Sequence, residues 1–157
     1  MSAATHPEER LAELGLKLPD VPKPAGAYVP ALRNGNLVFT SGQLPTVDGA
    51  LPATGKVGAA VAPEQAKELA QRCALNALAA VKSVVGDLAR VRRVVKVVGF
   101  VASDPGFTAQ PGVINGASEL LGAVFGDAGV HARSAVGVAV LPLDAPVEVE
   151  LIVEVEA

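Results

Sequence analysis

The last part of the chain alternates apolar and polar residues with a period of two. Residues 147–155 place valine or leucine at every odd position, while Glu148, Glu150 and Glu154 occupy even ones. Successive side chains of a β-strand point to opposite faces, so this run predicts a strand with one core face and one polar face. The β-branched run 91–102 and the alternating run 132–140 predict two further strands.

Two segments repeat their apolar residues at helical spacing instead. Residues 63–85 do so and end before Gly86, and residues 112–126 follow the same period despite their glycines. A short helix is also predicted over 7–15, because proline suits the first turn of a helix and glycine can end it. The prolines that follow, up to residue 30, keep the chain extended.

Two short β-rich runs, 27–33 and 36–44, flank an Asn-Gly pair that is typical of a hairpin turn. The whole order predicts an α+β domain in which two helices pack on one face of a mostly antiparallel sheet. The turn sequence LPLDAP separates the last two strands. It predicts a tight hairpin in which Val140 pairs with Val147 and Arg133 faces Glu154.

Arg133 stands in its strand above a row of small residues, which leaves room for a ligand or another subunit. The predicted hairpin puts Arg133 and Glu148 on the same uncovered face, roughly 20 Å apart along the sheet. A single small substrate cannot reach both within one chain. A site that uses both residues must therefore combine chains.

Composition restricts the function. The chain has 157 residues, half of them hydrophobic and 18% charged, which is typical of one compact domain. The net charge of -3 and the low aromatic content disfavour nucleic acid as a partner. A lone cysteine, Cys73, indicates a reducing compartment, and neither a signal peptide nor a membrane-length apolar run is found. We expect a cytoplasmic protein that binds no membrane.

Familiar catalytic motifs are missing from the sequence. The two histidines, His6 and His131, do not have metal-ligand spacing, and no glycine-rich phosphate loop lies between a strand and a helix. Ser41 lacks a recognisable base, and Cys73 lies within the small-residue face of a helix, as a packed hydrophobe would. We therefore expect no metal and no organic cofactor.

Three stretches carry a family resemblance: GAYVPALRNGNLVFTSGQLP, VINGASELLGAVFG and HARSAVGVAVLPLDAPVEVELIVEV. They resemble the RidA/YjgF family, also called the endoribonuclease L-PSP or reactive-intermediate deaminase family. The resemblance begins at about residue 25. It divides the chain into an N-terminal helix with a proline-rich wrapping segment, 1–24, and a RidA-like domain, 25–157.

The resemblance implies a fold like that of the trimeric chorismate mutase, with ligand sites in clefts between the subunits of a homotrimer. Some members of the family hydrolyse enamines and imines of the 2-aminoacrylate type to 2-keto acids and ammonia without a cofactor. By position, Arg133 matches the arginine that holds the substrate carboxylate, and Glu148 matches the glutamate that acts on water. These two are the expected catalytic residues.

The resemblance also implies four substrate-binding positions besides Arg133. They are Tyr28, Gly42, Asn115 and Ala135, and Ala135 stands where archetypal deaminases carry cysteine, so it would contribute its backbone. Two other functions stay open: a noncatalytic trimeric binder of small carboxylates or ketoacids, and an RNA-cleaving translation inhibitor. Arg133 could instead form a salt bridge with a neighbouring glutamate at a subunit interface, and Glu148 could be an ordinary solvated side chain.

Overall fold

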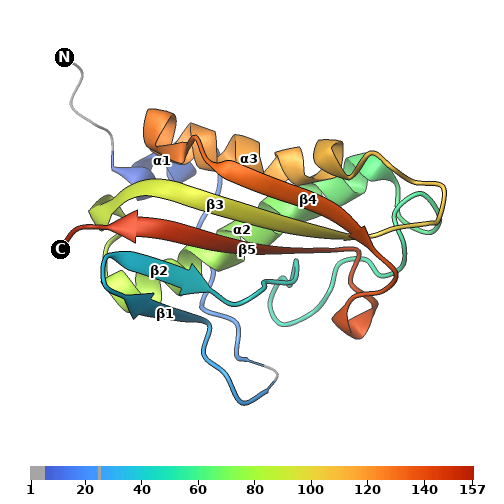
Figure 1. Ribbon diagram of the computed structural model, residues 1–157, viewed down its shortest axis with the longest axis horizontal. Coiled ribbons are helices and arrows are strands. Elements are labelled where there is room, and N and C mark those ends of the chain that lie inside the picture. The colour runs from blue at the N-terminus through green and yellow to red at the C-terminus, as the bar shows by residue number, and fades with distance from the viewer. Residues whose placement is uncertain (1–5, 25) are drawn as a thin grey trace.

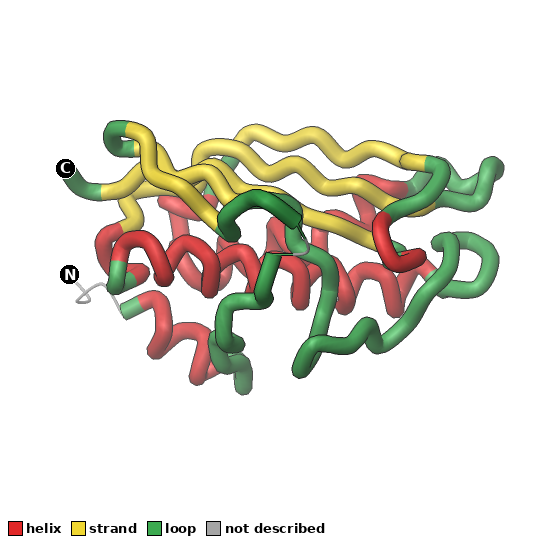
Figure 2. The backbone as a smooth tube through the Cα atoms, turned by 90° about the horizontal axis from the view of Figure 1, so that it is seen from below, coloured by secondary structure: helices red, strands yellow, loops and turns green. Residues whose placement is uncertain are grey.

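The computed structural model describes residues 6–24 and 26–157. It has two layers, with the helices on one face of a five-stranded sheet and the other face left without helices (Figure 2). Figure 1 shows the helices lying along the strands. The helices are α1 (Pro7–Glu13), α2 (Pro63–Val85) and α3 (Gln110–Phe125), and the strands are β1 (Ala31–Asn34), β2 (Leu37–Thr40), β3 (Val91–Ala102), β4 (Ala132–Val138) and β5 (Val147–Val155). The predicted α+β class is confirmed.

α2 has the predicted bounds, whereas α1 ends two residues earlier than predicted and α3 begins two residues earlier and ends one residue earlier. α2 has Pro63 in its first turn, and Gly86 follows its last turn with φ 85°, a backbone conformation that glycine adopts at little cost. The β1–β2 hairpin turns at Gly35, which has φ 64°. The valines and the leucine at the odd positions of β5 are all buried against the helices, as its period-two pattern predicts.

The strand order is β1-β2-β5-β3-β4, with β3 and β4 parallel and the other neighbours antiparallel. The predicted hairpin between 132–140 and 147–155 is therefore wrong. β4 is an edge strand that joins β3 through the crossover helix α3, and β5 lies on the opposite side of β3 (Figure 1). Val140 and Val147 do not pair, and Arg133 pairs with Val97 instead of facing Glu154.

This register also corrects the expected faces. Arg133 lies beside Val97 and Leu151, both of which are buried under the helices, so it belongs to the helix-covered face. Glu148 pairs with Phe100 and lies on the open face. Residues aligned across neighbouring strands share a face, and the next residue along a strand points to the other one. Arg133 and Glu148 therefore lie on opposite faces of the sheet.

The open face is strongly apolar. Its strands bring several large hydrophobic side chains together with the three glutamates of β5 and Lys96 of β3. These hydrophobic residues are Leu32, Leu37, Phe39, Val98, Phe100, Val136 and Ile152. Leu32 and Val136 remain 52% and 45% exposed. An exposed apolar surface of this kind usually marks an interface with another protein chain.

Helices α2 and α3 pack closely at Gly116, and this contact yields a stability prediction. A β-carbon at this position would overlap the carbonyl oxygen of Lys67, whereas one at Gly122 of the same helix would meet nothing within 4 Å. We expect Gly116→Ala to lower the free energy of unfolding by about 3 kcal/mol through overpacking. Gly122→Ala should raise it by roughly 0.5–1 kcal/mol, because alanine favours a helix over glycine. Urea unfolding of both variants measures the difference, and equal effects would contradict the close packing.

Candidate functional site

The Arg133 side chain is held against α3 by neutral acceptors. Its Nη1 donates to Asn115 Oδ1 at 2.7 Å and to Ser118 Oγ at 3.2 Å, and its Nη2 donates to the carbonyl oxygen of Pro111 at 3.4 Å. Asn115 and Ser118 are three residues apart, so they share one side of α3. We call Arg133, Asn115, Ser118 and Pro111 the arginine cluster.

The arginine cluster contains no carboxylate. In the described part of the chain, the salt bridges are those of His6 with Asp87, Lys67 with Glu119, and Lys82 with Glu8. Within residues 6–24 and 26–157 of one chain, Arg133 forms no salt bridge to a glutamate. A half-buried guanidinium with only neutral partners keeps unused N–H donors, among them Nε–H. The cluster can accept an anion.

Small residues lie next to Arg133 on the same face of β4. Ala135 pairs with Gly99, and Gly137 lies under the Gln110 side chain, whose Nε2 donates to Ser103 Oγ at 3.1 Å. Ala135 is half-buried and offers only a methyl group on this face. The row of small residues predicted from the sequence is confirmed, but it lies under the first half of α3 instead of on the open face.

Glu148 belongs to a second cluster, with Gly42. A β-carbon on residue 42 would overlap the Glu148 carboxylate, so glycine at this position is what gives the carboxylate its place. Gln43 pairs with Val149, which holds the segment after β2 alongside β5. The structure therefore brings Glu148 together with Gly42, and Arg133 together with Asn115, but it does not bring the two clusters together in one chain.

The environment of Glu148 favours its protonated form. Burial first, and then the negative charge of Glu150, raise the pKa of the Glu148 carboxyl above its usual value. A carboxylate whose pKa is raised is a better proton acceptor near neutral pH.

Cys73 lies beneath β5, and burial first, then the charge of Glu148, raise the pKa of its thiol. A fully buried, protonated thiol fits a packing role for Cys73.

The raised pKa of Glu148 predicts the pH dependence of a variant. The folded chain binds the proton more tightly than the unfolded chain does, so the contribution of Glu148 to stability is lost as pH rises through its folded pKa. Glutamine cannot ionise. We expect the free energy of unfolding of Glu148→Gln, relative to wild type, to increase from about pH 4 to about pH 7. Denaturant unfolding at both pH values tests the sign, and a decrease would contradict the raised pKa.

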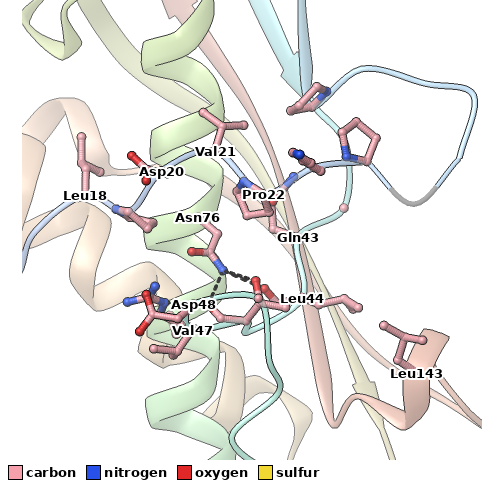
Figure 3. Close-up of a pocket in the computed structure, with 18 of the residues that line it drawn as sticks. Leu18, Asp20, Val21, Pro22, Gln43, Leu44, Val47, Asp48, Asn76 and Leu143 are labelled. Atoms are coloured by element: carbon pink, nitrogen blue, oxygen red, sulfur yellow. Dashed lines mark hydrogen bonds between the residues drawn. The ribbon is translucent and has the colours of Figure 1, made fainter.

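Tyr28 and Gly42 line a separate cleft of about 830 Å³. It lies between the proline-rich segment 17–24, the loop after β2 and helix α2 (Figure 3). The fully buried Asn76 organises its wall by donating from Nδ2 to the carbonyl oxygens of Leu44 at 2.9 Å and Thr46 at 3.1 Å. Arg133 and Asn115 do not line this cleft. Its position places Tyr28 near the Glu148 cluster and away from the arginine cluster.

Sequence reasoning missed Ser118, Asn76 and the contact of His131 with Ser118. His131 accompanies Ser118 through a contact of 2.9 Å between Nε2 and Oγ. The spacing carried the signal, because Ser118 follows Asn115 by nearly one helical turn and His131 precedes Arg133 by two residues of an extended segment. No helix of the described residues is long and apolar enough to cross a membrane.

Comparison with known proteins identifies the family. The family model described as "YjgF/chorismate_mutase-like, putative endoribonuclease" matches residues 8–155, which include α1 and the proline-rich segment. The curated protein TCP17 of Trypanosoma cruzi is 46% identical over 145 residues, which are 92% of this chain and 91% of that protein.

Solved structures agree with this match. Atu1372 of Agrobacterium tumefaciens is 48% identical with a TM-score of 0.90, over 98% of this chain and 94% of that one. TdcF of E. coli, solved with bound serine, is 26% identical with a TM-score of 0.59, over 87% and 94% of the two chains. The chain therefore belongs to the YjgF/chorismate mutase-like family, the RidA/YjgF family that its sequence resembles.

Proposed function

We propose that this protein is a cytoplasmic RidA-like deaminase, a hydrolase that converts enamines and imines of the 2-aminoacrylate type to 2-keto acids and ammonia. One observation carries the proposal: the Arg133 guanidinium is fixed by neutral acceptors and has no acidic partner in the described chain. A planar guanidinium binds a carboxylate through two parallel hydrogen bonds and so fixes its orientation. Serine bound to TdcF supports a small carboxylate as the ligand class.

The reaction needs a substrate held in a fixed orientation and a group that accepts a proton from water. Protonation of the enamine at its terminal carbon gives the iminium ion, which is the protonated imine. The oxygen of water then adds to the imine carbon, and the C–N bond of the resulting carbinolamine breaks to release ammonia and leave the keto group. Arg133 would hold the carboxylate, and Glu148 would take a proton from the attacking water.

We further propose that the site is completed between subunits of a homotrimer. Arg133, Asn115 and Ala135 would come from one chain, and Glu148, Gly42 and Tyr28 from its neighbour. The apolar open face supports this assembly, since it offers large hydrophobic side chains that the helices leave uncovered. A cleft formed in this way would exclude competing nucleophiles from the reactive imine.

Turnover tests the activity. A lyase that releases 2-aminoacrylate from serine supplies the substrate, and 2-keto acid and ammonia are followed with and without this protein. We expect catalytic amounts of protein to accelerate both products equally. If neither accelerates at any protein concentration, the deaminase proposal is wrong.

The assembly is a separate prediction. Sedimentation at micromolar concentration should give one species of three times the chain mass, because one chain alone exposes the apolar open face to water. Lys96→Glu would add a fourth acidic group to that face of each chain and should shift the equilibrium towards monomer. A wild-type chain that stays monomeric would exclude a site shared between subunits.

A noncatalytic binder of small carboxylates or ketoacids is the second candidate. The arginine cluster is complete within one chain, while Glu148 lies on the other face of the sheet. Binding without turnover requires the first cluster alone. Calorimetric binding of 2-oxobutanoate by a protein that releases no ammonia would establish this alternative.

A further inference from the structure

A chain of hydrogen bonds extends from Arg133 away from its free N–H groups. Arg133 Nη1 lies 3.2 Å from Ser118 Oγ, which lies 2.9 Å from His131 Nε2, and His131 Nδ1 lies 2.6 Å from the carbonyl oxygen of Gly129. The arginine cluster requires only the first of these contacts. Within the described chain, the hydrogen bonds of His131 go to Ser118 and Gly129 and not to Arg133.

The chemistry of the four groups fixes the direction of the two outer bonds, and the protonation of His131 decides the direction of the middle one. A guanidinium only donates and a carbonyl only accepts, so Ser118 Oγ accepts from Arg133 and His131 Nδ1 donates to Gly129. In neutral imidazole with its proton on Nδ1, Nε2 is an acceptor. Ser118 can then donate its own proton to Nε2. In this tautomer each ring nitrogen and the hydroxyl have one role, which fixes the rotation of the hydroxyl.

We infer that Ser118 and His131 are positioning residues that orient the Arg133 guanidinium for carboxylate binding. This inference rests on the proposed function. Asn115 and Ser118 occupy the N–H groups of Nη1 and Pro111 accepts from one N–H of Nη2, which leaves Nε–H and the second N–H of Nη2 to meet a ligand. With His131 as its acceptor, the Ser118 hydroxyl keeps a lone pair directed at Nη1. Without His131, that hydroxyl can rotate and donate elsewhere, and Arg133 loses one of the two contacts that hold its Nη1.

The arrangement is local in sequence as well as in space. Ser118 belongs to α3, and His131 immediately precedes β4. The hydrogen bond between them therefore links the crossover helix to the edge strand close to Arg133. Gly129 ends the short turn between them and is buried, which keeps its carbonyl oxygen in place. The role follows from this bonding and needs no contact between His131 and the substrate.

Binding of 2-oxobutanoate by titration calorimetry tests the inference. We expect Ser118→Ala and His131→Ala each to weaken binding about tenfold, and the double variant to bind no worse than either single one, because both break the same chain of bonds. Ser118→Thr keeps the hydroxyl and should bind within about twofold of wild type. Ser83→Ala, which removes an exposed hydroxyl from α2, is the matched control. In turnover, KM should rise while kcat stays near wild type.

Nitrogen NMR gives a readout that does not need a ligand. Wild-type His131 should be the tautomer protonated at Nδ1, and Ser118→Ala should speed the exchange of the Arg133 guanidinium protons. If wild type binds 2-oxobutanoate through Arg133 but both alanine variants bind equally well, the inference is wrong and the proposed function stands. If wild type does not bind, the proposed function fails. In that case the NMR readout still tests the positioning role. This role is excluded if wild-type His131 carries a proton on Nε2, or if Ser118→Ala leaves the exchange of the Arg133 guanidinium protons unchanged.

Discussion

Arg133→Ala is expected to reduce kcat/KM for imine hydrolysis by at least about 100-fold, because the variant loses the group that orients the substrate carboxylate. Arg133→Lys should recover little of this loss. Lysine keeps the charge but not the planar pair of donors. Its single ammonium group cannot donate to Asn115 and Ser118 and to both carboxylate oxygens at the same time. Initial rates of 2-keto acid and ammonia formation measure the effect.

Arg92→Ala provides the matched control for this loss. Arg92 is exposed at the start of β3 and belongs to neither cluster, so its removal changes the net charge equally and should leave turnover near wild type. Circular dichroism and sedimentation establish that each variant folds and assembles. Full turnover by a folded Arg133→Ala protein would remove the carboxylate-binding role from this residue.

The two faces of β5 could be predicted from the sequence, but the face of β4 that the helices cover and the partners of the strands could not. The period of two in β5 correctly places its valines in the core and Glu148 on the opposite side. The same period in β4 says nothing about which strand lies beside it. Two alternating runs joined by six residues favour a hairpin locally, whereas a strand, a helix and a second strand favour a parallel crossover. The crossover through α3 prevails, and β3 separates β4 from β5.

The turn sequence misled for a physical reason. Leu143 and Asp144 both adopt positive φ, 59° in each case, within a short turn of 3-10 type. This turn does not reverse the chain onto β4. The segment passes to the far side of β3 before β5 begins, and Ala102 at the end of β3 donates its N–H to the carbonyl oxygen of Pro146. A local turn signal therefore identified a loop without identifying the strands that it connects.

Each cluster of the site depends on contacts that the sequence pattern does not encode. Asn115 and Arg133 are 18 residues apart and meet because α3 lies across the β3–β4 edge. Gly42 and Glu148 meet because the segment after β2 follows β5. The family resemblance selected these four residues by position. It did not include Ser118. The spacing from Asn115 places Ser118 on the same side of the helix, and the packed structure adds that its hydroxyl reaches the same nitrogen of Arg133.

The separation of Arg133 from Glu148 within one chain now rests on the observed register. Arg133 aligns with Leu151 through Val97, so it lies two strands away from β5 and three residues along from Glu148. At about 4.8 Å per strand and 3.3 Å per residue, their Cα atoms are about 14 Å apart. Their side chains also leave opposite faces of the sheet. A small substrate can meet both only if they come from different chains.

Refolding Arg133→Ala together with Glu148→Gln should therefore restore activity that neither variant has alone. In a trimer, a cleft is intact when the chain that donates arginine carries Glu148→Gln and the chain that donates glutamate carries Arg133→Ala. Random assembly from equal amounts makes about a quarter of the clefts intact. We expect about that fraction of wild-type turnover, after native mass spectrometry of differently tagged chains confirms the mixed trimers. Each variant refolded alone is the control. Mixed trimers without recovered activity would show that the two residues do not complete one cleft between neighbouring chains.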